Sequence, residues 1–183
     1  MTTTQDAASF PRIPPAALAA AAFGAQLALR GRQPARRSTT LLAGGLVLGA
    51  GWFGLGAVVR FRARGTTVDP VDVGGTALVV DGPNSVTRNP MYVGLALGLV
   101  AHAVHRRALR GLLPVAGFVA AINRLQIPVE EAVLRERFGD EYERYVATTP
   151  RWLGLPRPAP ERRRSGAQEP DDRDPGPRRR GAA

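Results

Sequence analysis

The stretch "TLLAGGLVLGAGWFGLGAVV", residues 40–59, contains no charged side chain and is apolar on every face of a helix. A surface helix of a soluble protein carries its apolar residues along one stripe, so this pattern favours a helix that crosses a membrane. Its six glycines would weaken a helix in water. In lipid, however, small residues let neighbouring helices approach closely. We therefore expect a membrane-spanning helix here that packs on others through its glycines.

Three further apolar segments surround this one, at residues 13–29, 91–104 and 108–127. The first is near the lower length limit of about 17 residues for a membrane span. The last two are separated only by "HRR", which predicts an antiparallel hairpin, with Pro114 expected to kink its second helix. The sequence thus predicts an all-α integral membrane bundle of about four hydrophobic helices. A soluble four-helix bundle is the alternative, and the uniformly apolar segment 40–59 argues against it.

Charge is concentrated outside these segments. The net charge is +10, and every basic residue is an arginine. Much of it lies in "ERRRSGAQEPDDRDPGPRRRGAA" (161–183), which is poor in apolar residues and predicts a disordered basic tail over 155–183. Residues 1–12 are expected to be an N-terminal extension. The basic charge therefore does not indicate nucleic acid, and we expect membrane lipids as the surroundings.

Several kinds of site are disfavoured by composition. The chain has no cysteine, which excludes disulfides, thiolate metal sites and a cysteine nucleophile. His102 and His105 stand three residues apart and could face a metal ion. No third ligand type clusters near them, so we interpret the pair as a polar helix end and predict no metal site.

The segment after the fourth apolar run, "PVEEAVLRERFGDEYERYVATTPRW" (128–152), predicts two amphipathic helices at the membrane surface. Their shared apolar stripe runs through Leu134, Phe138, Tyr142 and Tyr145. Gly139 is expected to end the first helix. Asp140 and Glu143 are then expected to form the capping box of the second.

The stretch "TRNPMYVG" (87–94) brings polar residues to the start of a membrane helix. A hairpin would place Arg88 and Tyr92 at the same membrane edge as Glu130 and Glu131. Charged groups at that depth are costly unless they are paired or bind something. The residues alone leave two interpretations: a ligand site, or an arginine that merely pairs with a glutamate.

A resemblance favours the ligand site. "LVVDGPNSVTRNPMYVG" (78–94), followed after a hydrophobic hairpin by "EEAVLRERFGDEYERYVATTPRWLG" (130–154), resembles the isoprenylcysteine carboxyl methyltransferase family. That family belongs with the phospholipid methyltransferases, integral membrane enzymes that use S-adenosylmethionine. The resemblance covers about residues 66–154. It implies a methyltransferase core at 60–154, whereas the two transmembrane helices expected at 13–59 are predicted from hydropathy alone.

The resemblance also implies site residues. Glu130 matches the cofactor-binding glutamate, and Arg88 is placed to pair with the cofactor carboxylate. The full cofactor set that it implies is Thr76, Ala77, Leu78, Val79, Arg88, Asn89, Pro90, Met91, Tyr92 and Glu130. Arg124 and Gln126 are expected near the methyl acceptor. No catalytic side chain is expected, because methyl transfer to a carboxylate or free amine requires alignment and exclusion of water rather than a dedicated base.

Three residues depart from the family pattern. Asn89 stands where a histidine is usual, Asn84 where an aromatic residue follows "GP", and Gln126 where carboxyl-methylating members have an arginine. Asn84 puts one stacking contact in doubt. Gln126 weakens the case for a prenylcysteine carboxylate as acceptor, although Arg124 lies close by in the sequence.

The function expected from the sequence is a membrane-embedded, S-adenosylmethionine-dependent methyltransferase that acts on a lipophilic acceptor by O- or N-methylation. Two alternatives remain open: a non-enzymatic membrane protein with the same scaffold, and an NADPH-dependent reductase of the related sterol reductase type. The expected location is a bacterial plasma membrane. Arginines lie on both sides of the predicted spans, so supply of the cofactor, rather than charge, places the active site toward the cytoplasm.

Overall fold

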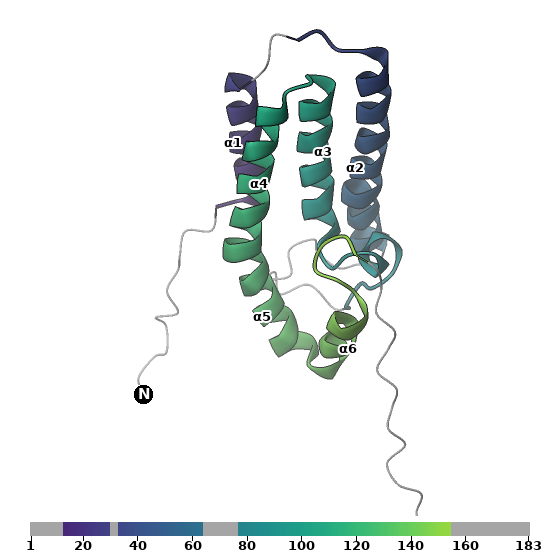
Figure 1. The fold of residues 1–183 in the computed structure, drawn as a ribbon. Helices are drawn as coiled ribbons and strands as arrows, with labels where there is room; N and C mark the ends of the chain where they lie inside the picture. Colours follow the sequence, from purple (N-terminus) through teal and green to yellow (C-terminus); the bar gives the residue numbers. More distant parts are fainter. Residues whose placement is uncertain (1–12, 30–32, 64–76, 155–183) are drawn as a thin grey trace, which may run out of the picture.

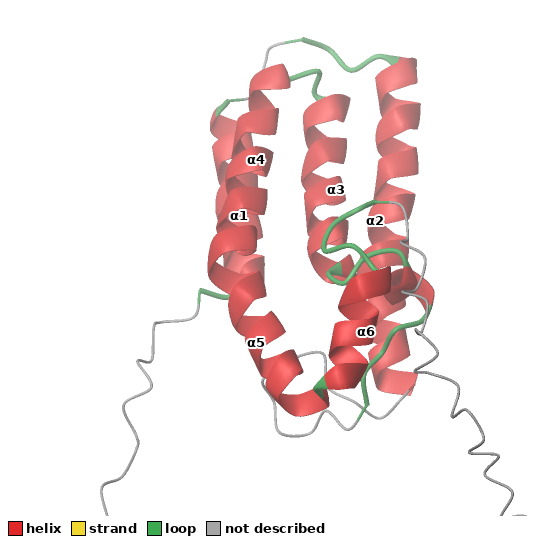
Figure 2. Ribbon diagram, turned by 60° about the horizontal axis from the view of Figure 1, so that its bottom comes forward, coloured by secondary structure: helices red, strands yellow, loops and turns green. Residues whose placement is uncertain are grey.

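The computed structural model describes residues 13–29, 33–63 and 77–154, and these residues form helices and loops without a strand (Figures 1 and 2). The predicted terminal segments 1–12 and 155–183 lie outside the described residues. The elements, in chain order, are α1 (Pro15–Ala28), α2 (Arg37–Ala63), η1 (Gly82–Ser85), α3 (Pro90–His105), η2 (Leu109–Gly111), α4 (Leu112–Ala121), η3 (Ile122–Gln126), α5 (Ile127–Phe138) and α6 (Asp140–Thr148).

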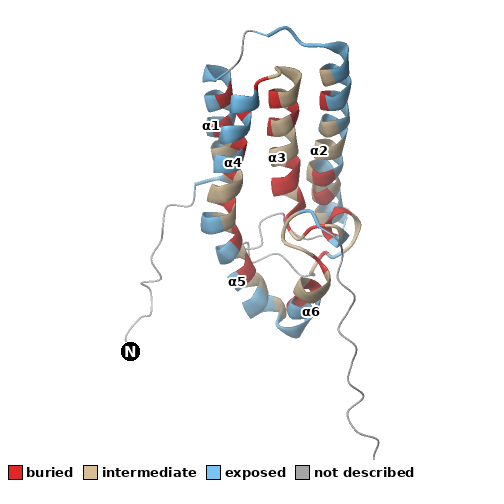
Figure 3. Ribbon diagram, viewed as in Figure 1, coloured by how far each residue is buried: buried red, intermediate tan, exposed pale blue. Residues whose placement is uncertain are grey.

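Four helices, α1 to α4, stand side by side, and α5 and α6 lie at one end of them (Figure 1). Two segments are long and apolar enough to cross a bilayer: α2, and the continuous helical segment Leu109–Phe138. The outward face of α2 is apolar, with Leu41, Leu48 and Leu55 at least 70% exposed (Figure 3). Such a face suits lipid rather than water. The predicted all-α membrane bundle is confirmed.

The predicted hairpin is formed by α3 and α4. Gln26 of α1 secures it: its Nε2 donates to the carbonyl oxygens of Leu99 and Gly111, both at 2.9 Å. The Gln26 Oε1 atom lies 3.0 Å from His102 Nδ1. Because lipid offers no hydrogen bonds, a fully paired glutamine in the core is a strong constraint on helix position. His105 instead faces α2, with its Nδ1 3.4 Å from the Thr40 hydroxyl.

The helical segment Leu109–Phe138 contains two prolines. Pro114, where a kink was expected, is the third residue of α4 and the sixth of the whole segment. The departure from α geometry is the π-helical turn η3, directly before Pro128 in the first turn of α5. Because Pro128 cannot donate to the preceding turn, the backbone widens there, and α5 leaves the line of α4 (Figure 1).

The C-terminal helices dock on the end of the bundle. Gly139, with φ +46°, ends α5 as predicted, because this left-handed conformation favours glycine. The predicted capping box is wrong: α6 begins at Asp140 without a side-chain cap, and Glu143 accepts from Arg135 Nε at 2.9 Å instead. Tyr145 donates its hydroxyl proton to the Asn84 carbonyl oxygen at 2.6 Å, which ties α6 to η1.

Candidate functional site

The polar stretch before α3 is held by the segment that follows α6. Thr87 Oγ1 and Asn89 Nδ2 both donate to the Arg151 carbonyl oxygen at 2.9 Å. The Arg88 backbone N–H donates to the Pro150 carbonyl oxygen, also at 2.9 Å. Pro90 then starts α3, a position where a residue without an N–H is well tolerated. These contacts fix where the first turn of α3 points.

The guanidinium group of Arg88 is buried and faces a glutamate. Its Nη2 lies 3.1 Å from Glu131 Oε1, and the two side chains are only 9% and 6% exposed. Arg151 also contacts Glu131, with Nε–Oε1 and Nη2–Oε2 distances of 3.0 and 2.6 Å. This hydrogen bonding raises the pKa of Arg151. Within the described residues, Nε and Nη1 of Arg88 are buried without a hydrogen-bond partner.

Arg151 and Trp152 also reach the π-helical turn. Arg151 Nη1 and Trp152 Nε1 both donate to Asn123 Oδ1, at 3.3 and 3.1 Å. We call the segment 149–152 the clasp, because it joins the start of α3 to η3 and α5. Asn123, Arg151 and Trp152 were not among the site residues expected from the sequence. The "TPRW" stretch was the available signal, but its spacing does not reveal which helix it meets.

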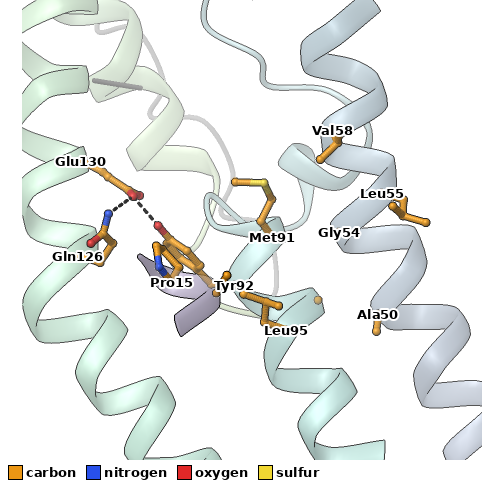
Figure 4. Close-up of a pocket in the computed structure, with 12 residues that line it drawn as sticks. Pro15, Ala50, Gly54, Leu55, Val58, Met91, Tyr92, Leu95, Gln126 and Glu130 are labelled. Carbon is orange, nitrogen blue, oxygen red and sulfur yellow. Dashed lines mark hydrogen bonds between the residues drawn. The ribbon is translucent and has the colours of Figure 1, made fainter. Parts of the chain in front are cut away.

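A cavity of about 580 Å³ lies beside this network (Figure 4). Its polar end is formed by Tyr92, Gln126 and Glu130. Tyr92 donates its hydroxyl proton to Glu130 Oε1, and Gln126 Nε2 donates to the same oxygen at 2.9 Å. The remaining lining is apolar and comes from three helices: Pro15 and Ala16 of α1, Ala50, Gly54, Leu55 and Val58 of α2, and Met91, Gly94 and Leu95 of α3.

The cavity is shaped by a close approach of two helices. A Cβ atom added at Gly94 would lie 2.9 Å from both the Ala50 carbonyl oxygen and the Gly54 nitrogen. A glycine is therefore needed where α3 crosses α2. The tight fit depends on this glycine of α3, since an added Cβ at Gly54 of α2 would meet nothing within 4 Å. Of the α2 glycines, Gly56 is closely packed, because an added Cβ there would lie 3.1 Å from Pro83 Cγ. By contrast, Gly44, Gly45 and Gly51 have open space around them.

The structure gathers some of the expected site residues at the cavity and leaves others away from it. Met91, Tyr92, Gln126 and Glu130 line it, whereas Arg124 is exposed and does not. Val79, Asn89 and Pro90 are buried nearby in the chain, Leu78 is half-buried and Ala77 is exposed. Thr76 lies outside the described residues.

The arrangement pairs a short polar end with long apolar walls. A carboxylate, a phenol and an amide can bind a head group that donates hydrogen bonds or carries positive charge. Cavities of this size and character commonly bind small molecules. Because α1 and α2 provide most of the apolar wall, and Gln126 and Glu130 belong to η3 and α5, the site is built from the N-terminal and the C-terminal helices together.

Comparisons with known proteins identify the family of this chain. The sequence pattern of the phospholipid methyltransferase family matches residues 38–141, from the start of α2 to the start of α6. A protein of Haemophilus influenzae, described as uncharacterized, is 41% identical over 63 residues, which are 34% of this chain and 100% of that protein. No solved structure matches the chain significantly. Because the family pattern spans more than half of the chain, including most of the cavity lining, the protein belongs to the phospholipid methyltransferase family.

Proposed function

We propose that this membrane protein is an S-adenosylmethionine-dependent methyltransferase that acts on a lipophilic acceptor. The observation that carries the proposal is the cavity with Glu130, Tyr92 and Gln126 at one end and apolar helix faces along the rest. Family membership supports methyl transfer as the reaction class.

The residues at the polar end suit this cofactor. Its ammonium group and ribose hydroxyls are hydrogen-bond donors, which the carboxylate of Glu130 can accept. The Tyr92 ring offers an aromatic face to a cation. Met91 lies on the same turn of α3 and lines the apolar side. We assign cofactor contacts to these three residues first, and extend them to the loop 77–79 and to Asn89 and Pro90 on the strength of the family resemblance.

The chemistry requires alignment more than proton transfer. When bound at Glu130, Tyr92 and Met91, the cofactor would supply an electrophilic methyl group with a thioether as its leaving group, and the acceptor would supply the lone pair. Tyr92 and Gln126 hold the Glu130 carboxylate in one orientation. The apolar walls exclude water from the reacting groups. Alignment and exclusion of this kind can lower a barrier by about 7–11 kcal/mol in well-oriented systems.

The described lining leaves both an amine and a carboxylate open as the acceptor. Among the described residues that line the cavity, none is an arginine or lysine. Arg124, the residue expected near a carboxylate acceptor, is exposed and absent from the lining. The proposal therefore covers O- and N-methylation alike.

Isothermal titration of the detergent-purified protein tests the proposal. The ligands are S-adenosylmethionine, its demethylated product S-adenosylhomocysteine, and NADPH. We expect binding of the first two and none of NADPH. Binding of NADPH alone would support the reductase alternative, and binding of none of the three would leave a non-enzymatic scaffold.

A further inference from the structure

The end of the bundle opposite the candidate site is strongly basic. It contains the loop before α2 and the turn between α3 and α4, whose described arginines are Arg36, Arg37, Arg106, Arg107 and Arg110. The described residues 13–29, 33–63 and 90–129 contain no aspartate or glutamate. Of the five guanidinium groups, that of Arg107 contacts a described residue, with an Nη1–oxygen distance of 3.5 Å to the Pro34 carbonyl. No described acidic side chain neutralises this end.

Two of these arginines stand where positive charge is least favourable. Arg37 is the first residue of α2, and Arg36 immediately precedes it; the first turn contains no acidic residue. The start of a helix carries partial positive charge from its unpaired N–H groups, so cations there raise the free energy of the folded state. An anion at this position would offset both the helix dipole and the two guanidinium groups.

Two cavities that share Thr40 as a lining residue lie at this end of α2, and we call them together the groove. One cavity of about 340 Å³ is lined by Arg36, Arg37 and Thr40 among others. A second, of about 330 Å³, shares Thr40 and continues between α2 and α3, where Gly44 and Gly98 form part of its wall. Neither glycine has a non-neighbouring atom within 4 Å of an added Cβ. The cavity at Arg36 and Arg37 could hold a charged head group, and the open cavity beside Gly44 and Gly98 could hold an acyl chain attached to it.

We propose that this groove binds an anionic phospholipid, with the phosphate at Arg36 and Arg37 and an acyl chain between α2 and α3. A soluble anion would leave the lower cavity unused. A second copy of the chain would bring the same basic surface and be repelled. The site is distinct from the candidate active site, because Tyr92 and His105 are separated by roughly 20 Å along α3 at about 1.5 Å per residue.

Native mass spectrometry of the delipidated protein tests the proposal, with phosphatidylglycerol and phosphatidylcholine of identical acyl chains added to the detergent. We expect preferential retention of phosphatidylglycerol. The double variant Arg36→Gln/Arg37→Gln should lower that retention about tenfold or more, since each surface arginine contributes on the order of a fivefold effect. The control Arg62→Gln/Arg144→Gln removes the same charge at the other end and should retain the lipid like the parent.

The acyl-chain part of the site has its own test. Gly98→Leu should fill the groove and reduce phosphatidylglycerol retention, whereas Gly117→Leu, which also has open space but does not line the groove, should not. Glycerol phosphate, the head group without chains, should compete poorly with the lipid. The proposal is overturned by equal retention of the two lipids in the parent, or by equal effects of each variant and its control. Effective competition by glycerol phosphate would overturn the proposal as well, because it would show that the site binds an anion and does not recognise an acyl chain.

Discussion

At the scale of single residues, Glu130 is the central residue of the proposed site, since it accepts hydrogen bonds from Tyr92 and Gln126 at the cavity's polar end. Glu130→Ala should weaken binding of S-adenosylhomocysteine about tenfold or more, because loss of a charged hydrogen-bond partner costs about 1.5–3 kcal/mol. Titration calorimetry measures the change. Glu136→Ala, an exposed glutamate on the same helix, is the control, and equal affinities for both variants would remove Glu130 from the site.

Gly94 gives a second prediction at this scale, on packing rather than binding. Gly94→Ala places a methyl group about 2.9 Å from the α2 backbone. Backbone cannot move aside as a side chain can, so we expect a loss of about 1–3 kcal/mol of stability, typical of overpacking. Gly98→Ala, four residues later on the same helix with nothing near its Cβ, should be neutral or stabilising. Thermal unfolding in detergent compares the two, and equal midpoints would contradict the close crossing of α2 and α3.

Tyr142 links a single side chain to alkaline stability. Burial raises its pKa from 10.0 to about 12, with a smaller upward contribution from Glu131. Unfolded chains therefore lose this proton first, so the stability contribution is complete below pH about 10 and is lost as pH rises toward about 12. The melting midpoint should fall across this window, and less steeply in Tyr142→Phe. Identical slopes in parent and variant would show that other groups control the alkaline transition.

At the scale of elements, the clasp joins helices that the chain separates widely. Segment 149–152 fixes the stretch before α3 through backbone acceptors and fixes α5 through Arg151 and Glu131. Tyr92 and Glu130 meet across the cavity, and both lie close in the chain to an anchored residue: Tyr92 comes three residues after Asn89, and Glu130 directly precedes Glu131. The clasp thereby sets the relative position of the two residues at the polar end.

Glu131 is the centre of that connection and provides the element-scale prediction. Glu131→Gln leaves Arg88 buried without its counter-charge, and loss of one partner of a buried pair typically costs about 3–5 kcal/mol. Glu143→Gln breaks the pair with Arg135, in which both side chains are about half exposed, and should cost less than about 1 kcal/mol. Unfolding by denaturant measures both. Similar losses for the two variants would mean that the buried cluster is no more important than the surface pair.

At the scale of the whole molecule, the absence of cysteine allows a direct test of orientation. If the proposed cofactor is supplied from the cytoplasm, the end with α5 and α6 is expected to face the cytoplasm. Single cysteines introduced by Glu141→Cys and Ser38→Cys report the two ends, since both positions are exposed. In intact cells, an impermeant thiol reagent should label Ser38→Cys only, and lysed cells should label both. The reverse pattern would place the candidate site outside and contradict a cytoplasmic cofactor supply.

The sequence by itself determined the class of fold and the family. These conclusions required only local composition and spacing, which do not depend on how each helix is rotated. The features used were the uncharged run 40–59, the short connection at 105–107 and the ordered pattern over 66–154. Glu130 and Tyr92 came from the same pattern. The C-terminal helix boundary at Gly139 was predictable for the same reason, because a left-handed turn residue acts locally.

Only the tertiary structure decided which side chains face one another. Gln26 donates hydrogen bonds to the α3–α4 hairpin, and Arg88 forms an ion pair with Glu131. Asn123 accepts hydrogen bonds from both Arg151 and Trp152. Each of these depends on the rotation of one helix against another, which packing across many residues fixes and which no single stretch of sequence contains.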